Sequence, residues 1–198
     1  DLGEGPLWDA QEQRLLWVDI MTARINSFHP GSGRSSGWKT PEPVGAAALR
    51  ASGGLIAALG SGFFSLDEAS GALTKLATYE SAGPDIRMND GKCDPAGRFW
   101  AGTMAFDQRP GAGALYRLDP DHAVSTVVAG VSISNGLDWT PSLDAMYYID
   151  SPTARIDIFD YDPQSGAIAN RRPFVQIEEG AGWPDGMTVD AEGDVWVA

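Results

Sequence analysis

The segment Asp94–Ala101, with the sequence DPAGRFWA, decides the fold, because the chain repeats its pattern of a polar turn followed by a short apolar run. Proline after aspartate and glycine at the turn exit provide the backbone angles that tight turns require. Related phrases occur at residues 9–17 (DAQEQRLLW), 50–57 (RASGGLIA), 140–148 (TPSLDAMYY) and 190–197 (DAEGDVWV). Each phrase predicts a turn between two short β-strands.

A second kind of turn follows each of the first four phrases, at residues 29–33, 67–71, 119–121 and 162–166. Each repeat therefore accounts for about four short strands. In one repeat we expect them near Asn89–Cys93, Phe99–Met104, Ala114–Leu118 and Val124–Val128. No stretch of helical length shows the periodicity of about 3.6 residues that an amphipathic helix needs. The chain is predicted to be all-β.

Four strands per repeat, with repeats of about 40–50 residues, are typical of β-propeller blades rather than of a β-sandwich. We expect a single domain with repeats near residues 4–44, 45–88, 89–134, 135–184 and 185–198, or about four and a half blades. The alternative is a sandwich whose turns resemble one another by accident. Because the last repeat stops inside its second strand, we also expect a piece of a larger ring, truncated at its C-terminus.

The composition excludes several classes of partner. The 198 residues include 14 basic and 27 acidic side chains, a formal net charge of −13, so nucleic acid is not an expected partner. No apolar run, including residues 46–49, exceeds five residues, which is too short to cross a bilayer as a helix, and no membrane association is expected. The single cysteine, Cys93, excludes an internal disulfide, and we expect a cytoplasmic protein. The sequence carries no signal for oligomeric state.

Aligning the turn phrases also aligns the residue five positions before each of them. These residues are Glu4, Gly45, Asn89, Asn135 and Asp185, separated by 41, 44, 46 and 50 residues. In a propeller, equivalent positions on the innermost strands converge on the central channel. Carboxylate and carboxamide oxygens are the ligands that Ca²⁺ prefers, and Zn²⁺, Mn²⁺ or Mg²⁺ with bound water are alternatives. The simpler interpretation is that Asn and Asp only turn the chain at strand starts.

Other side chains of the repeats have structural or supporting interpretations. Arg87 lies two residues before Asn89, so strand alternation places both side chains on the same side. A cation there would suit an anionic substrate or an oxyanion, although an arginine at a strand entrance is more often solvated. Cys93 is expected to be a small buried hydrophobe. Tryptophans of the phrases are expected to pack between blades, namely Trp8, Trp17, Trp100, Trp139 and Trp196.

The motifs resemble those of the SMP-30/gluconolactonase family over essentially the whole chain. The matching segments are Gly3–Trp8, Arg87–Lys92, Asp94–Arg98, Gly102–Met104, Gly113–Tyr116, Ile133–Trp139, Tyr148–Ser151, Phe159–Asp162 and Pro184–Met187. The resemblance implies a six-bladed β-propeller with one divalent metal ion at the channel mouth. It further implies that Glu4, Asn135 and Asp185 bind the metal, and that Arg87 and Asn89 contact a sugar lactone.

One segment departs from the family pattern. The loop Ala105–Gly111 is shorter than in animal members of the family and lacks their loop glutamate, for which Asp107 is the candidate replacement. The substrate preference within the sugar lactones is therefore not predicted.

The function expected from these residues is metal-dependent hydrolysis of sugar lactones to aldonic acids. Asp185 is the candidate general base, because a carboxylate that binds the metal also lies within reach of water on that metal. Arg87 and Asn89 would hydrogen-bond sugar hydroxyls and stabilise the developing oxyanion. The alternatives are a calcium-binding regulatory propeller without catalysis, a hydrolase of organophosphates or aryl esters on the same metal site, and an interaction scaffold.

Overall fold

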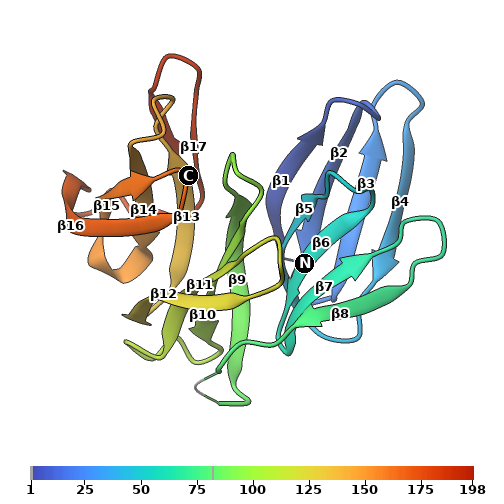
Figure 1. Ribbon diagram of the computed structural model, residues 1–198, viewed down its shortest axis with the longest axis horizontal. Coiled ribbons are helices and arrows are strands. Elements are labelled where there is room, and N and C mark those ends of the chain that lie inside the picture. Colours follow the sequence, from blue (N-terminus) through green and yellow to red (C-terminus); the bar gives the residue numbers. More distant parts are fainter. Residues whose placement is uncertain (1, 82) are drawn as a thin grey trace.

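The computed structural model describes residues 2–81 and 83–198, which form four four-stranded antiparallel sheets and one two-stranded sheet (Figure 1). The first sheet contains β1 (Gly3–Asp9), β2 (Arg14–Asp19), β3 (Arg24–His29) and β4 (Arg34–Lys39), and the second contains β5 (Val44–Leu49), β6 (Leu55–Leu59), β7 (Gly62–Leu66) and β8 (Leu73–Ala77). The third contains β9 (Ile86–Cys93), β10 (Phe99–Ala105), β11 (Gly113–Leu118) and β12 (Val124–Val131). The fourth contains β13 (Ser134–Trp139), β14 (Ala145–Asp150), β15 (Arg155–Asp162) and β16 (Ala167–Gln176), and the fifth contains β17 (Met187–Val189) and β18 (Val195–Val197). A single 3₁₀ turn, η1 (Ser151–Thr153), follows β14 among the described residues.

The all-β prediction is confirmed, and the strands expected in the third repeat are present. β9 begins at Ile86, three residues earlier than predicted, and β12 extends to Val131. Within each four-stranded sheet the strand order is the chain order, as in an up-and-down meander. The sheets do not close into a ring over the described residues. None of the helical segments in residues 2–81 and 83–198 is long and apolar enough to span a membrane.

Neighbouring sheets pack face to face, so each internal sheet is buried on both sides. Strand alternation in β10 shows this directly: Phe99 and Ala101 pack against the second sheet, while Trp100 packs against the fourth. β10 is buried along its whole length, which follows from this two-sided packing. The remaining apolar clusters lie between the first and second sheets and between the fourth and fifth.

The prediction that tryptophans pack between sheets holds for some members only. Trp100 and Trp139 are buried and contact each other edge to face, with ring centroids 5.8 Å apart. Trp8 and Trp196 are 48% and 64% exposed, so the prediction is wrong for them within the described structure. Leu7 and Val195, which precede these tryptophans in the sequence, pack on a neighbouring sheet. Because side chains alternate along a strand, Trp8 and Trp196 lie on the opposite face, which no described sheet covers.

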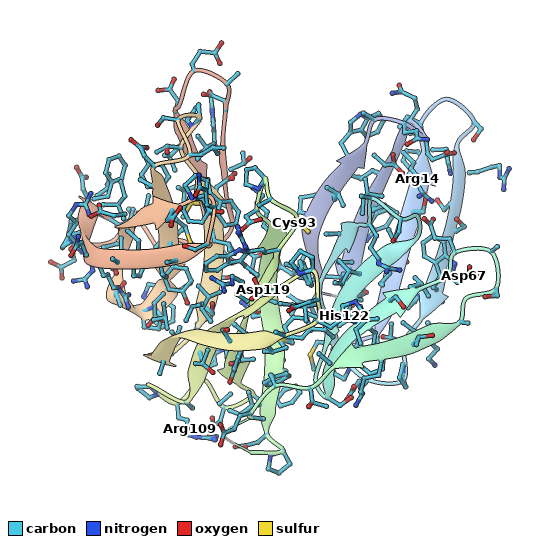
Figure 2. The ribbon with its side chains drawn as sticks, in the orientation of Figure 1. Arg14, Asp67, Cys93, Arg109, Asp119 and His122 are labelled. Carbon is cyan, nitrogen blue, oxygen red and sulfur yellow. The ribbon has the colours of Figure 1, made fainter. Side chains whose placement is uncertain are left out.

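The turn phrases also connect sheets through buried polar contacts. The Asp94 carboxylate accepts hydrogen bonds from Arg98, from the Trp100 indole at 3.1 Å and from the Tyr161 hydroxyl at 2.8 Å. Arg98 in turn donates to the carbonyl oxygens of Pro163 and Gln164, in the outer turn of the fourth sheet. The Arg14 guanidinium (Figure 2) makes the corresponding contact between the first two sheets, through an ion pair with Glu68. The turn phrases therefore fix the third sheet to the fourth and the first sheet to the second.

The first strands of successive sheets approach one another closely. β5 contacts β9, β9 contacts β13 and β13 contacts β17, while the last strands β4, β8 and β16 lie at the periphery (Figure 1). A Cβ on Gly45 would lie 2.6 Å from the backbone nitrogen of Asn89, and one on Gly136 would lie 2.7 Å from that of Met187. Both distances are shorter than a side chain allows, so these glycines are needed for the close approach.

Candidate functional site

Four of the five aligned positions share a local structure that the repeat did not predict. In each of the four-stranded sheets, the register between the first and second strands shifts at the aligned residue. The shifts lie between Glu4 and Leu7, between Val44 and Ala46, opposite Ala101–Thr103 and between Ser134 and Leu137. A β-bulge re-aims the side chains next to it and is common beside functional sites. The bulges therefore set the direction of Glu4, Asn89 and Asn135.

A chain of hydrogen bonds links three of the predicted residues. The Arg87 Nη1 donates to Asn89 Oδ1 at 2.7 Å, which confirms that alternation places these side chains together. Asn89 Nδ2 donates to Asn135 Oδ1 at 2.8 Å and to the Ser134 carbonyl at 2.8 Å. All three side chains belong to residues that are at most 9% exposed. Residues 46 positions apart in sequence thus form one buried network.

The network continues through Ser151, which sequence reasoning missed. Asn135 Nδ2 donates to Ser151 Oγ at 2.7 Å, and that hydroxyl donates to the Pro184 carbonyl at 2.6 Å. The backbone of Asp185 is then joined to the same region, because Gly136 N donates to its carbonyl at 3.1 Å. Ser151 therefore fixes the Asn135 amide and connects it to the segment that carries Asp185.

The connection before β13 is held by a carboxylate. Asp150, at the end of β14, accepts hydrogen bonds from the backbone nitrogens of Ser132 and Ile133, the latter at 2.9 Å. Ser151 N also donates to the Ile133 carbonyl at 3.2 Å. These contacts position the entrance of the strand that carries Asn135.

Glu4, Asp90 and Asp185 form a group of carboxylates that repel one another. Burial raises the pKa of Glu4, and the charges of Asp185 and Asp90 raise it further, while Arg87 opposes the change. Burial raises the pKa of Asp90 to about 6, with a contribution from Asp185 in the same direction. Glu4 is half-buried and Asp185 is exposed. The predicted ligands Glu4 and Asp185 are thus within electrostatic reach of each other and of Arg87.

The donor set and the charge of this group fit a hard divalent cation. Three carboxylates and one guanidinium leave a formal charge of −2, which one divalent ion would balance. No group of three His, Cys, Asp or Glu side chains in the described part of the chain is placed to hold a metal ion, and a site here would include an amide oxygen. Asn135 Oδ1 accepts one hydrogen bond and has a second lone pair available. Oxygen donors of these types suit Ca²⁺ best.

The loop Ala105–Gly111 is held by contacts of Arg109. Asp107 accepts hydrogen bonds from the backbone and the guanidinium of Arg109, and its side chain is 63% exposed. Arg109 also forms an ion pair with Asp85, which fixes the loop to the start of the third sheet. The ring of Phe106 instead lines a cavity of about 410 Å³ that Arg87 also lines. Phe106, and not Asp107, is therefore the loop residue that lines the same cavity as Arg87.

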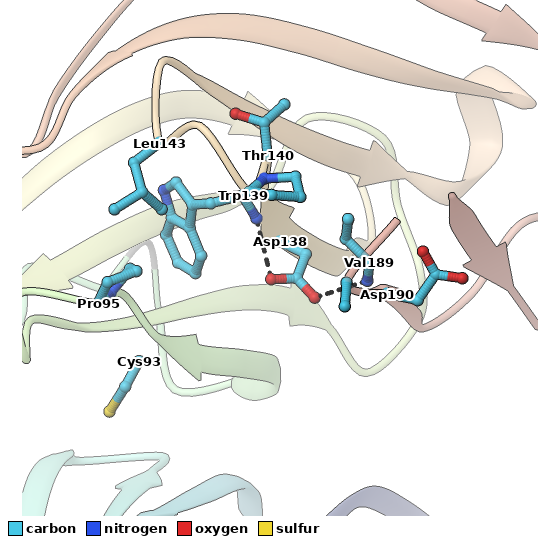
Figure 3. A pocket seen from close by; sticks show the side chains of 10 residues that line it. Cys93, Pro95, Asp138, Trp139, Thr140, Leu143, Val189 and Asp190 are labelled. Carbon is cyan, nitrogen blue, oxygen red and sulfur yellow. Dashed lines mark hydrogen bonds between the residues drawn. The ribbon is translucent and has the colours of Figure 1, made fainter. Parts of the chain in front are cut away.

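A second cavity lies at the other end of the inner strands. Its volume is about 310 Å³, and it is lined by Cys93, Asp138, Trp139 and Val189 among others (Figure 3). Cys93 and Arg109 are seen at opposite ends of the third sheet (Figure 2). Asp138 accepts hydrogen bonds from the backbone nitrogens of Trp139 and Val189. Burial raises the pKa of the Cys93 thiol to about 11, so this cysteine is not a thiolate near neutral pH.

Comparison with known proteins assigns the chain to a family. The model of the SMP-30/gluconolactonase/LRE-like region matches residues 2–198. Regucalcin of Xenopus laevis is 41% identical over 202 residues, and the Bacillus subtilis protein YvrE, named as a candidate sugar lactone lactonase, is 40% identical over 197. The match covers the whole of this chain and 68% of either relative.

A solved structure agrees with the sequence comparison. That of a calcium-binding protein, regucalcin, from Agrobacterium tumefaciens superposes with a TM-score of 0.94 at 31% identity, covering 100% of this chain and 67% of that one. The superposition covers the whole length of this chain, including all five sheets. The chain therefore belongs to the SMP-30/gluconolactonase/LRE-like family.

Proposed function

We propose that the protein is a divalent-metal-dependent hydrolase that opens sugar lactones to aldonic acids. The observation that supports this most is the buried chain Arg87–Asn89–Asn135 beside the carboxylates of Glu4 and Asp185. It combines donors for a sugar with a negatively charged group that a metal ion would neutralise. The similarity to a candidate sugar lactone lactonase is consistent with this chemistry.

In the proposed reaction, water adds to the lactone carbonyl carbon and the ring C–O bond breaks. The ring oxygen takes a proton and leaves as a hydroxyl, and the acyl group becomes a carboxylic acid. Asp185, an exposed carboxylate, removes the proton from the attacking water and returns it to the departing ring oxygen. Arg87 donates to the carbonyl oxygen as negative charge develops on it, and Asn89 holds the guanidinium and hydrogen-bonds a sugar hydroxyl.

The residues that would hold the metal are Glu4, Asn135 and Asp185. When bound, a divalent ion supplies Lewis acidity that polarises the lactone carbonyl and makes water more acidic. Ca²⁺ is the preferred ion for this donor set, with Zn²⁺, Mn²⁺ and Mg²⁺ as alternatives. Ser151 would keep the Asn135 oxygen directed to the site, because it binds the nitrogen of the same amide.

We further infer the architecture of a six-bladed β-propeller, in which the five observed sheets supply four complete blades and the first two strands of a fifth. The two-sided packing of the internal sheets supports this, and so does the greater length of the matched relatives. In such a ring the bulges of the first strands would all lie around one axis.

A panel of sugar lactones tests the proposed function. The protein is stripped of metal with a chelator, reconstituted separately with Ca²⁺, Zn²⁺, Mn²⁺ or Mg²⁺, and assayed for acid release with glucono-1,5-lactone among the substrates. Turnover that depends on added metal is expected. Calcium binding without turnover of any lactone would favour a regulatory calcium-binding propeller, an alternative that the similarity to the calcium-binding regucalcin of Agrobacterium tumefaciens supports. Turnover of aryl esters or organophosphates without turnover of any lactone would favour the alternative of a hydrolase for those esters on the same metal site.

A further inference from the structure

The cavity beside Arg87 lies between the second and third sheets and is distinct from the group of carboxylates. Its volume of about 410 Å³ falls in the range of about 300–1,000 Å³ that small-molecule sites occupy. Its walls include Glu42, Pro43, Gly60, Ile86, Arg87 and Phe106. Glu42, Pro43 and Gly60 flank strands of the second sheet, whereas Phe106 follows β10 of the third.

Arg87 connects this cavity to the proposed reaction site. It is 8% exposed, and its Nη1 donates hydrogen bonds to the Met88 carbonyl at 3.0 Å and to Asn89 Oδ1. No carboxylate of the described residues forms an ion pair with its guanidinium. A buried cation without an ion-pair partner retains donors for a ligand, and Arg87 is one of the residues that line the cavity.

The opposite wall provides an acceptor. Glu42 Oε1 accepts a hydrogen bond from the backbone nitrogen of Ser61 at 3.0 Å and another from the Ser61 hydroxyl. Lys75 donates to that same hydroxyl at 3.1 Å, which holds Ser61 in place. The second oxygen of Glu42 accepts no hydrogen bond from a described residue. A fixed carboxylate with one free oxygen is suited to accept hydrogen bonds from hydroxyl groups.

Phe106 provides an apolar surface on the third side. The residue is 47% exposed, and its backbone nitrogen donates to the Asp85 carbonyl at 3.0 Å. The ion pair between Arg109 and Asp85 holds the following part of the loop. Because the loop is already fixed, little conformational entropy is lost when a ligand packs on the ring.

A sugar matches all three groups. A sugar ring offers hydroxyls that accept from Arg87 and donate to Glu42, and a C–H face that packs on an aromatic ring. A phosphate group would be repelled by Glu42, and an alkyl chain would offer no hydrogen bond to the second oxygen of Glu42 or to the guanidinium of Arg87. We propose, on the basis of the lactonase function above, that this cavity binds a glycosyl substituent, so that the preferred substrates are lactones of disaccharide aldonic acids.

Steady-state kinetics on two lactones test this proposal. The metal-reconstituted protein is expected to hydrolyse cellobiono-1,5-lactone with a kcat/KM about tenfold higher than that for glucono-1,5-lactone. Phe106→Ala and Glu42→Ala change residues that flank two different sheets. Each is expected to lower the ratio of kcat/KM for the disaccharide lactone to that for gluconolactone severalfold. The matched control is Phe174→Ala: Phe174 is also 47% exposed but lies on β16, so its removal should leave the ratio unchanged.

The outcomes separate the two proposals. Hydrolysis of gluconolactone with no preference for the disaccharide lactone would overturn the glycosyl site and leave the lactonase function intact. A preference that persists in both the Phe106 and the Glu42 variants would also overturn it. Hydrolysis of neither lactone with any metal would reject the lactonase function, and the glycosyl site with it.

Discussion

Asn89 and Asn135 join the first strands of two neighbouring sheets through a hydrogen bond of 2.8 Å from Nδ2 to Oδ1. The two residues are equivalent positions of successive repeats, and each lies at a β-bulge. The same bond that connects the sheets also orients the Asn135 oxygen, which is a proposed metal ligand. The contact between these two sheets and the direction of the proposed ligand therefore depend on the same pair of amides.

Asp185→Ala is expected to lower kcat/KM for the best lactone by at least about 100-fold, because it removes both a metal ligand and the general base. Acid release by the metal-reconstituted protein is the measurement. Asp194→Ala, which changes an exposed aspartate of the turn between β17 and β18, serves as the control and should retain full activity. Undiminished turnover of the Asp185 variant would remove this residue from the mechanism.

Ser151→Ala is expected to weaken Ca²⁺ binding by about 10–100-fold without removing a ligand, because the Asn135 amide loses the partner of its nitrogen. Calorimetric titration of the metal-free protein measures this effect. Ser165→Ala changes an exposed turn serine of the same sheet and should bind Ca²⁺ like the wild type. Equal affinities of all three proteins would show that Ser151 has no positioning role.

Asp90→Asn is expected to stabilise the metal-free protein at pH 8 but not at pH 4. Burial raises the pKa of Asp90 to about 6, above the ordinary value of about 3.9. The native state thus binds the Asp90 proton more tightly than the unfolded state does. The stabilisation that this proton provides is complete below about pH 4 and is lost as the pH rises through about 6. The gain in free energy of unfolding at pH 8 should be about 1–3 kcal/mol. Urea unfolding at both pH values checks it, and a loss of stability at pH 8 would contradict it.

Arg98→Ala is expected to lower the free energy of unfolding by about 3–5 kcal/mol, because it leaves the fully buried Asp94 carboxylate without its cation. Arg172→Ala is the matched control: its ion pair with Asp160 is about half exposed on both sides and should contribute less than about 1 kcal/mol. Urea unfolding of the two variants compares them. Similar losses would mean that the turn phrase does not stabilise the contact between the third and fourth sheets.

Much of the fold could be predicted because the repeat is local. The phrase Asp94–Ala101 specifies a turn between two strands, and strand alternation correctly placed Arg87 and Asn89 together. The spacing of the phrases also identified Asn89 and Asn135, which the structure joins. The β-bulges were not predicted, since they depend on the pairing with the next strand rather than on the residues of one strand.

The contacts that were missed involve residues brought together only by the packing of sheets. Ser151 follows β14, and no motif relates it to Asn135 or to Pro184. Asp107 was a candidate from its position in the loop, but the nearby Arg109 binds it. Phe106 had no signal in the sequence, because its proximity to Arg87 arises from the return of the chain after β10.

The central claim is that one divalent cation is bound by oxygens of Glu4, Asn135 and Asp185. A crystal structure of the protein soaked with Mn²⁺, with an anomalous difference map, tests it most directly. We expect one strong peak about 2.0–2.6 Å from an oxygen of each of these three side chains. A peak elsewhere, or no peak near them at a Mn²⁺ concentration that supports hydrolysis, would contradict the claim.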